Sequence, residues 1–284
     1  MVKFFRPKKM TIARKTLIIG MLIGLAANAG AQVKLTVDTL ECHVIGFSFG
    51  LLAPGYGNTS TGMTGGNVRD LYAGPYLNFG INCDYKYKSN WMVTLDADMW
   101  FGSNSDNLKD RYERMGDVFS PEHLALGWGG YDGNMVFYNR NVAARLGLAK
   151  MFTLTPKNPN SGVLLKVSGG WVTQKTVFYQ DFDQSPVMQL SGDYAKLYDH
   201  LRNGVILTES LGGYYMNNQS TYINFRLTFE ISQMWTWSSR PYIIDNVMGL
   251  NGPDKNRYFD LIYGVRLTWM FPLMGKTTYD YYYY

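Results

Sequence analysis

Eight ionisable side chains stand in strand-like stretches of the chain, each at a position that alternates with apolar residues. Acidic and basic groups that share a protein interior must form ion pairs, because an unpaired buried charge is strongly destabilising. We therefore predict that these side chains face one another in an enclosed lumen and neutralise each other. The alternative is a narrow polar path or a small-ligand site. The set consists of Asp96, Asp98, Arg145, Lys166, Arg226, Glu230, Asp260 and Arg266.

These residues give little support for a catalytic function. Asp96 and Asp98 share one face of a strand, as the acids of an aspartyl-type protease could, but no inward acid–histidine pair on another strand matches them. Of the histidines, His43 has no neighbouring serine, whereas His123 and His200 lie in expected loops. A metal site built from two cysteines without a nearby histidine pair is not expected either. The sequence thus predicts no catalytic residue, no metal site and no cofactor.

Strand-like alternation supplies the elements that would position the charges. Between 221 and 237, bulky apolar residues such as Phe225 and Phe229 alternate with polar ones such as Arg226 and Glu230. A period of two places the two sets on opposite faces of an extended strand. The apolar face is suited to lipid and the charged face to a polar interior. Eight strands are predicted, at 42–52, 71–85, 91–101, 135–150, 163–178, 204–216, 221–237 and 257–271.

The sixth of these strands fits the pattern least well. Val205, Leu207 and Leu211 share their parity with Glu209, which would put a carboxylate on the apolar face. We expect a β-bulge or a position at the rim there.

The first 31 residues are typical of a secretory signal peptide. A basic segment without acidic residues precedes an apolar run at 17–27, and Ala29-Gly30-Ala31 offers a cleavage site before Gln32. The apolar run is well short of the ~20 residues that a spanning helix needs. Six of the 27 basic residues lie in this leader, which leaves 21 basic against 22 acidic residues and a net charge of −1. The basic balance is therefore no evidence for a nucleic-acid partner.

The connections between the expected strands alternate in length. Short links at 86–90, 153–162 and 217–220 alternate with long ones, as short periplasmic turns alternate with long extracellular loops in outer-membrane barrels. The 22 Tyr, 15 Phe and seven Trp suit aromatic girdles at both membrane interfaces. The fold class predicted for 32–274 is all-β, an eight-stranded antiparallel transmembrane β-barrel surrounded by outer-membrane lipid. An even strand number places both termini in the periplasm.

Two smaller features complete the expected plan. Alternation places Cys42 on the inward face of its strand and Cys83 on the outward face of the next, which argues against a disulfide unless a bulge intervenes. Helical spacing of apolar residues at 191–203 predicts a short amphipathic helix in the third long loop.

The final strand at 258–269, together with 224–240, resembles small outer-membrane β-barrel proteins of the Bacteroidetes type, within the porin-like and OmpA/OmpX-like barrels. Such a resemblance implies either a porin-like barrel or an accessory subunit of an outer-membrane machine, such as type IX secretion or barrel assembly. One departure is that many bacterial barrels end on a terminal aromatic, whereas this chain continues past Phe271.

The last ten residues, 275–284, would form a tyrosine-rich tail in the periplasm. Five tyrosines there provide either a docking peptide for an outer-membrane or periplasmic protein partner, or a frayed terminus that rests on lipid headgroups. These residues are Tyr279, Tyr281, Tyr282, Tyr283 and Tyr284.

The function predicted from these features is a non-catalytic outer-membrane barrel with a structural or partner-binding role. The first alternative is an accessory subunit of a secretion or assembly machine, which a stoichiometric partner would reveal. The second is a lipid-modifying enzyme, which activity on membrane lipid would reveal.

Overall fold

The structure is a computed structural model of the full chain, and it describes residues 39, 41–59, 75–102, 135–155, 158–180, 190–217, 223–245 and 250–273. The expected signal peptide at 1–31, the tyrosine-rich tail at 275–284 and His123 lie outside the described residues.

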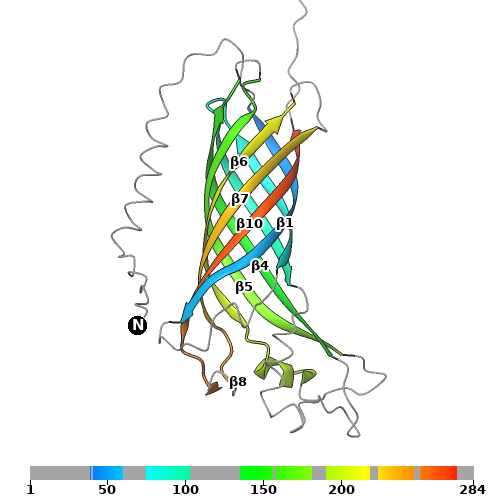
Figure 1. Ribbon diagram of the computed structural model, residues 1–284, viewed down its shortest axis with the longest axis vertical. Helices are drawn as coiled ribbons and strands as arrows, with labels where there is room; N and C mark the ends of the chain where they lie inside the picture. Colours follow the sequence, from blue (N-terminus) through cyan, green and yellow to red (C-terminus); the bar gives the residue numbers. More distant parts are fainter. Residues whose placement is uncertain are drawn as a thin grey trace, which may run out of the picture. The chain divides into compact units, whose positions relative to one another are not determined.

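Eight long strands close into one antiparallel barrel, which confirms the predicted fold class (Figure 1). Their order around the barrel is β1-β10-β7-β6-β5-β4-β3-β2, so each strand pairs with its neighbours in sequence and β10 closes on β1. The barrel strands are β1 (Cys42–Thr59), β2 (Tyr76–Lys86), β3 (Trp91–Gly102), β4 (Met135–Thr153), β5 (Gly162–Gln180), β6 (Arg202–Met216), β7 (Asn224–Ser238) and β10 (Arg257–Leu273).

The observed strands match the predicted ones apart from their ends. Strand β1 continues to Thr59, because a register shift between Pro54 and Gly57 lets it stay paired with β10 beyond the proline. Strand β6 begins at Arg202, two residues earlier than predicted. Positions 71–74 and 221–222 of the predicted strands lie outside the described residues.

The two ends of the barrel differ in their connections. At one end, which we call the turn end, short links join β2 to β3, β4 to β5 and β6 to β7. The first of these turns at Asn90, whose φ of 60° lies in the left-handed region that Asn tolerates. Strand β1 begins and β10 ends there, with His43 opposite Leu273. The strand ends that the longer connections of the sequence join form the opposite end, which we call the loop end.

The described parts of the long connections contain little regular structure. The helix predicted at 191–203 is wrong: only the 3-10 turn η2 (Tyr194–Leu197) forms. Positive φ angles at Gly192 and His200 interrupt the helical path on both sides, and β6 takes the last residues of the predicted helix. Between β7 and β10 lies a small hairpin of β8 (Ile243–Asp245) and β9 (Leu250–Gly252), which the sequence did not suggest.

Within the described ranges, no helix is long and apolar enough to cross a membrane.

Side chains of the barrel have the opposite distribution to those of a water-soluble protein. Along β7, polar residues at alternate positions are buried, whereas Phe225, Leu227 and Phe229 are exposed, the last of them to 64%. Exposed tryptophans mark both ends, with Trp91 toward the turn end and Trp237 toward the loop end. An apolar exterior between aromatic girdles is the surface of a β-barrel that spans a lipid bilayer.

The bulge or rim position expected at Glu209 is wrong. Strand β6 keeps one register with β5 and with β7 along its whole length, and Glu209 pairs with Val167 and Ile231 in mid-strand. Its neighbours Thr208 and Ser210 point inward and hydrogen-bond to charged groups of the lumen. Because these inward contacts set the register, Glu209 must lie half-buried on the exterior.

An arginine on the exterior should have a cost that depends on its depth in the bilayer. Phe229→Arg, in the middle of β7, should destabilise the folded barrel by about 2–4 kcal/mol, whereas Tyr179→Arg, near the loop end of β5, should cost about 0–1 kcal/mol. Reversible urea unfolding in lipid vesicles measures both. Equal costs for the two variants would contradict a membrane-spanning exterior.

Candidate functional site

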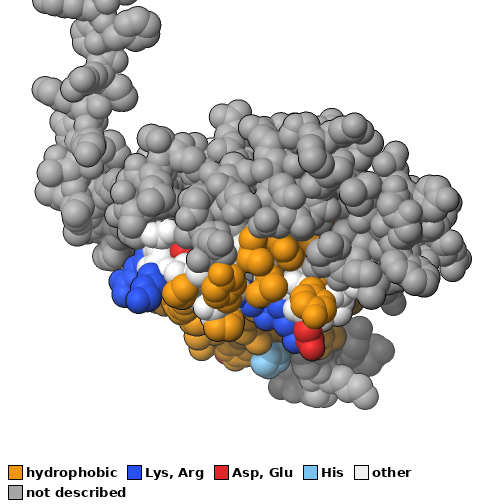
Figure 2. All heavy atoms as spheres, turned by 90° about the horizontal axis from the view of Figure 1, so that it is seen from below, with side chains coloured by type: hydrophobic (Ala, Val, Ile, Leu, Met, Phe, Trp, Pro, Cys, Tyr) orange, Lys and Arg blue, Asp and Glu red, His pale blue; other side chains and the backbone are white. Residues whose placement is uncertain are grey.

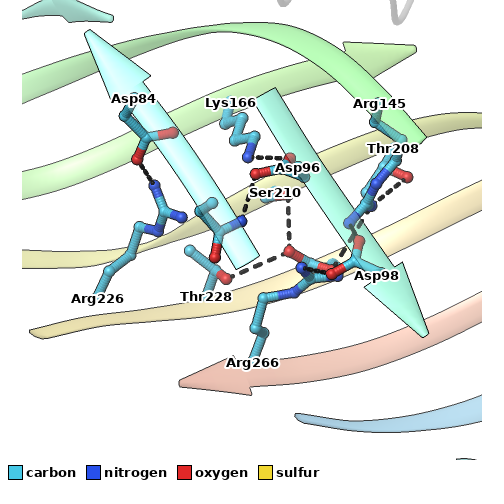
Figure 3. Close-up of polar contacts among 12 residues, drawn as sticks. Asp84, Asp96, Asp98, Arg145, Lys166, Thr208, Ser210, Arg226, Thr228 and Arg266 are labelled. Carbon is cyan, nitrogen blue, oxygen red and sulfur yellow. Dashed lines mark hydrogen bonds and ion pairs between the residues drawn. The ribbon is translucent and has the colours of Figure 1, made fainter. Parts of the chain in front are cut away.

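A network of eight buried charged side chains fills the middle of the lumen (Figure 3). It brings together seven of the eight sequence-predicted charges and adds one carboxylate that the prediction left out. The acidic members are Asp84, Asp96, Asp98 and Glu230, and the basic members are Arg145, Lys166, Arg226 and Arg266.

Asp98 is the centre of the largest cluster. One oxygen of its carboxylate accepts a hydrogen bond from Arg145, and the other lies 2.6 Å from Nη1 of Arg266. Arg266 also approaches Glu230 at 2.9 Å, and Arg145 reaches the same carboxylate at 3.9 Å. Two guanidinium groups from β4 and β10 thus bridge two carboxylates from β3 and β7 across the lumen.

Two further pairs lie nearer the turn end. Nζ of Lys166 is 2.5 Å from Asp96, which also accepts a hydrogen bond from Asn82. Nη1 of Arg226 is 2.7 Å from Asp84, so β7 is tied across the lumen to β2. In total four cations face four carboxylates, and the network has no net formal charge. Paired in this way, the charges avoid most of the penalty that isolation in a low-dielectric interior would impose.

Glycines on adjacent strands make room for the large charged side chains. A Cβ atom at Gly80 would lie 2.2 Å from Oδ1 of Asp98, the atom that binds Arg266. A side chain there would push the carboxylate out of its ion pair. The same pairing of a glycine with a charged residue in register recurs around the barrel, as Gly80 with Asp98, Gly170 with Arg145, Gly50 with Arg266 and Gly264 with Glu230.

An apolar ring lies inside the barrel on the loop-end side of the network. Each of the eight barrel strands contributes one buried side chain to it, and the largest is Trp100, which is 1% exposed. The ring consists of Leu52, Tyr76, Trp100, Ala143, Val172, Ile206, Met234 and Ile262.

A second apolar layer, rich in methionine, closes the lumen on the turn-end side. It consists of Cys42, Val44, Met92, Ala149, Met151, Leu164, Tyr214, Met216 and Met270.

The order of residues along β3 shows how the layers are stacked. Reading from the turn end, the inward positions are Met92 of the methionine-rich layer, then Thr94, then Asp96 and Asp98 of the network, and then Trp100 of the apolar ring. An eight-stranded barrel has an interior only just wide enough for side chains to fill. The network is therefore enclosed by apolar side chains at both ends, which strengthens its ion pairs and opposes a continuous water path.

Asp260 was predicted to join the network, and the structure places it elsewhere. It is buried at the loop end of β10, beyond the apolar-ring residue Ile262. Within the part of the chain that the structure describes, it forms no ion pair with a network member. A buried cation on its side of the ring is Arg202, whose guanidinium lies 3.4 Å from the ring centroid of Tyr258. The apolar ring divides the inward charges into two groups, and alternation alone could not reveal that division.

One member of the network and the apolar ring beside it were missed from the sequence. Asp84 follows the outward-facing Cys83, so parity alone would have placed it in the lumen with the others. The apolar ring was missed because alternation predicts polar residues at inward positions, and a single inward apolar residue such as Ile206 only interrupts that pattern. The two cysteines do lie on opposite faces, with Cys42 buried in the methionine-rich layer and Cys83 exposed on the exterior.

A Gly-x-Ser-x-Gly pattern at Gly46–Gly50 also escaped the sequence reasoning. In hydrolases this pattern forms a sharp turn between a strand and a helix that exposes the serine. Here it runs straight through β1, and Ser48 is buried in the lumen between Gly80 and Thr268. The Gly46–Gly50 pattern therefore does not form a nucleophile elbow.

The described residues also contain no group of three or more His, Cys, Asp or Glu that could hold a metal ion.

No protein-family model matches this sequence, and no curated protein matches it. Among solved structures, the barrel is similar to the N-terminal β-barrel domain of OprF from Pseudomonas aeruginosa (9% identity, TM-score 0.34) and to the attachment invasion locus protein Ail of Yersinia pestis (10% identity, TM-score 0.33). Each match covers 82% of this chain and 100% of the other. The outer membrane protein OprG of P. aeruginosa matches at 12% identity and a TM-score of 0.33, over 82% of this chain and 97% of its own.

Removing one partner of a lumen ion pair should cost more than removing an exterior apolar group. Arg226→Ala leaves Asp84 buried without its cation, so we expect a loss of about 3–5 kcal/mol in the free energy of unfolding. The adjacent Leu227→Ala, on the exterior, should lose about 2 kcal/mol or less. Urea unfolding in vesicles measures both.

The double variant Asp84→Leu/Arg226→Met is the matched control, because it removes both charges and keeps the space filled. It should recover most of the stability lost in Arg226→Ala. If Arg226→Ala is no less stable than Leu227→Ala, the ion pair does not stabilise the barrel.

Proposed function

We propose that this protein is a non-conducting, non-catalytic barrel of the bacterial outer membrane, with a structural or partner-binding role. The observation that carries the proposal is the filling of the lumen. A charge network without net charge lies between two apolar layers, and each barrel strand contributes to the layer on the loop-end side.

The apolar exterior supports placement in the outer membrane. Exposed bulky apolar residues surround the barrel between two aromatic girdles, as bacterial outer-membrane barrels require. The short turns would face the periplasm and the long connections the outside. Because β1 begins and β10 ends at the turn end, both termini would then lie on the periplasmic side.

A partner-binding role fits a barrel whose interior is filled, because its remaining accessible surfaces are the two ends and the exterior. The tyrosine-rich tail, Tyr279 and Tyr281–Tyr284, would be presented to the periplasm beyond β10, where an outer-membrane or periplasmic protein could dock. Membership of a secretion or assembly machine is a more specific form of this role. A lipid-modifying enzyme that used Ser48 as its nucleophile is disfavoured by the buried position of this residue in β1.

The filled lumen should block ion flow. Purified protein reconstituted in planar bilayers should show no stable open channel, since the network and both apolar layers occupy the interior. Conductance traces recorded beside a general porin, as a positive control for insertion, provide the measurement. Stable steps comparable to those of the porin would refute the non-conducting barrel.

The leader should be removed and the mature protein should reach the outer membrane. N-terminal sequencing by mass spectrometry should find a chain that begins at or near Gln32, in the outer-membrane fraction. An intact leader, or recovery from the soluble periplasm, would contradict this placement.

The same detergent extract tests the partner-binding role. A co-purifying protein in stoichiometric amount, lost when residues 275–284 are deleted, would support docking through the tail. Retention of that protein by the deletion variant would refute docking through the tail, and the absence of any such protein would leave the structural role.

A further inference from the structure

A groove of about 910 Å³ lies against the exterior of the barrel at the loop end. Its walls come from the loop end of β6, from β7 and from the start of β10 with the residues before it. Figure 2 looks at the barrel from the loop end and shows Lys and Arg side chains among the hydrophobic ones in the part that the grey atoms leave in view.

The floor of the groove is aromatic and faces the lipid side. Trp235 and Trp237 are outward residues of β7, exposed to 41% and 40%, and Val205 of β6 pairs with Trp235. The ring of Phe259 on β10 lies 5.4 Å from that of Trp235. These side chains form a continuous apolar surface at the level of the aromatic girdle, where acyl chains meet headgroups.

Two exposed cations line the groove, and its lining carboxylate is bound by residues of its own segment. Lys255 and Arg257 are exposed, and Arg257 pairs in register with Trp237. Asp254 is buried, and its carboxylate accepts hydrogen bonds from the Tyr258 hydroxyl at 2.7 Å and from the backbone N–H of Asn256 at 3.0 Å. Lys255 and Arg257 thus present two exposed cations next to the apolar floor, whereas the Asp254 carboxylate is held within its own segment.

We propose that this groove binds a phosphorylated lipid A molecule of the outer leaflet. An acyl chain would lie on the surface formed by Trp235, Trp237, Phe259 and Val205, while Lys255 and Arg257 would bind headgroup phosphate. Basic side chains next to apolar membrane-facing surfaces recognise anionic lipid headgroups in this way. Lipid A is the occupant that fits, because the long connections of an outer-membrane barrel face the outer leaflet, where this lipid resides. The inference rests on the proposed outer-membrane placement.

The test uses the full mature protein in nonionic detergent, with native mass spectrometry to count bound lipids. The probes are lipid A, phosphatidylglycerol and the deacylated phosphorylated disaccharide of lipid A. We expect one lipid A per barrel, with at least tenfold weaker binding of the other two probes. Lys255→Gln/Arg257→Gln should weaken lipid A binding at least tenfold.

The matched control is Arg140→Gln/Lys175→Gln, which removes two exposed cations from β4 and β5 on the loop-end half of the barrel, outside the groove. It should change the affinity less than twofold, and circular dichroism confirms that each variant is folded. Trp235→Ala should weaken lipid A binding while leaving both cations in place.

Several results would overturn the proposal. Absence of lipid A binding would do so, as would equal loss of binding in the two double variants. Equal binding of phosphatidylglycerol would show that the site does not select lipid A, and equal binding of the deacylated disaccharide would show that the apolar floor is not used. Cell fractionation reports separately on the outer-membrane placement, so failure of the groove and failure of the placement can be distinguished.

Discussion

Ion pairing around Asp98 is the interaction on which the rest of the lumen depends. One carboxylate on β3 binds guanidinium groups from β4 and β10, strands that are not neighbours in the barrel. Those two arginines also reach Glu230 on β7, so the cluster links four of the eight strands across the interior. Such contacts specify the register of each strand, because a slip of one residue would turn a charge outward into lipid. The mid-strand position of Glu209 shows the strength of this constraint, since the inward register of β6 is kept although it places a carboxylate on the exterior.

The apolar layers explain how a charged interior is compatible with a stable barrel. The ring that includes Trp100 and Ile206 and the methionine-rich layer that includes Met92 enclose the network from opposite ends. Exclusion of water strengthens each ion pair, and it also makes every unpaired member costly. Equal numbers of buried cations and carboxylates are what such an enclosure requires. Glycines such as Gly80 are the steric counterpart, because they leave the space that the charged side chains occupy.

The same alternation of residues thus accounts for membrane contact and for lumen filling, because the outward residues of each strand contact lipid and the inward residues fill the lumen. A filled lumen leaves the exterior and the two ends as the surfaces for interaction. At the loop end, Asp254 turns inward to Tyr258 and leaves Lys255 and Arg257 on the outside beside an aromatic floor. That local arrangement gives one side of the barrel a chemistry that suits an anionic amphiphile.

The sequence by itself determined the barrel, because a period of two with apolar residues outward is a local property of each strand. It placed all eight strands and the inward direction of seven network charges, including Asp98 and Arg266. Only the tertiary structure decided which charges meet, because partners such as Arg226 and Asp84 are 142 residues apart and come from strands that are not neighbours in the barrel. It also separated Asp260 from the network. The apolar ring between them consists of one side chain from each strand, so the sequence of any single strand does not reveal it. The short helix predicted near η2 failed for a related reason: backbone conformations at Gly192 and His200, together with the pairing of Arg202 in β6, overrode a weak local periodicity.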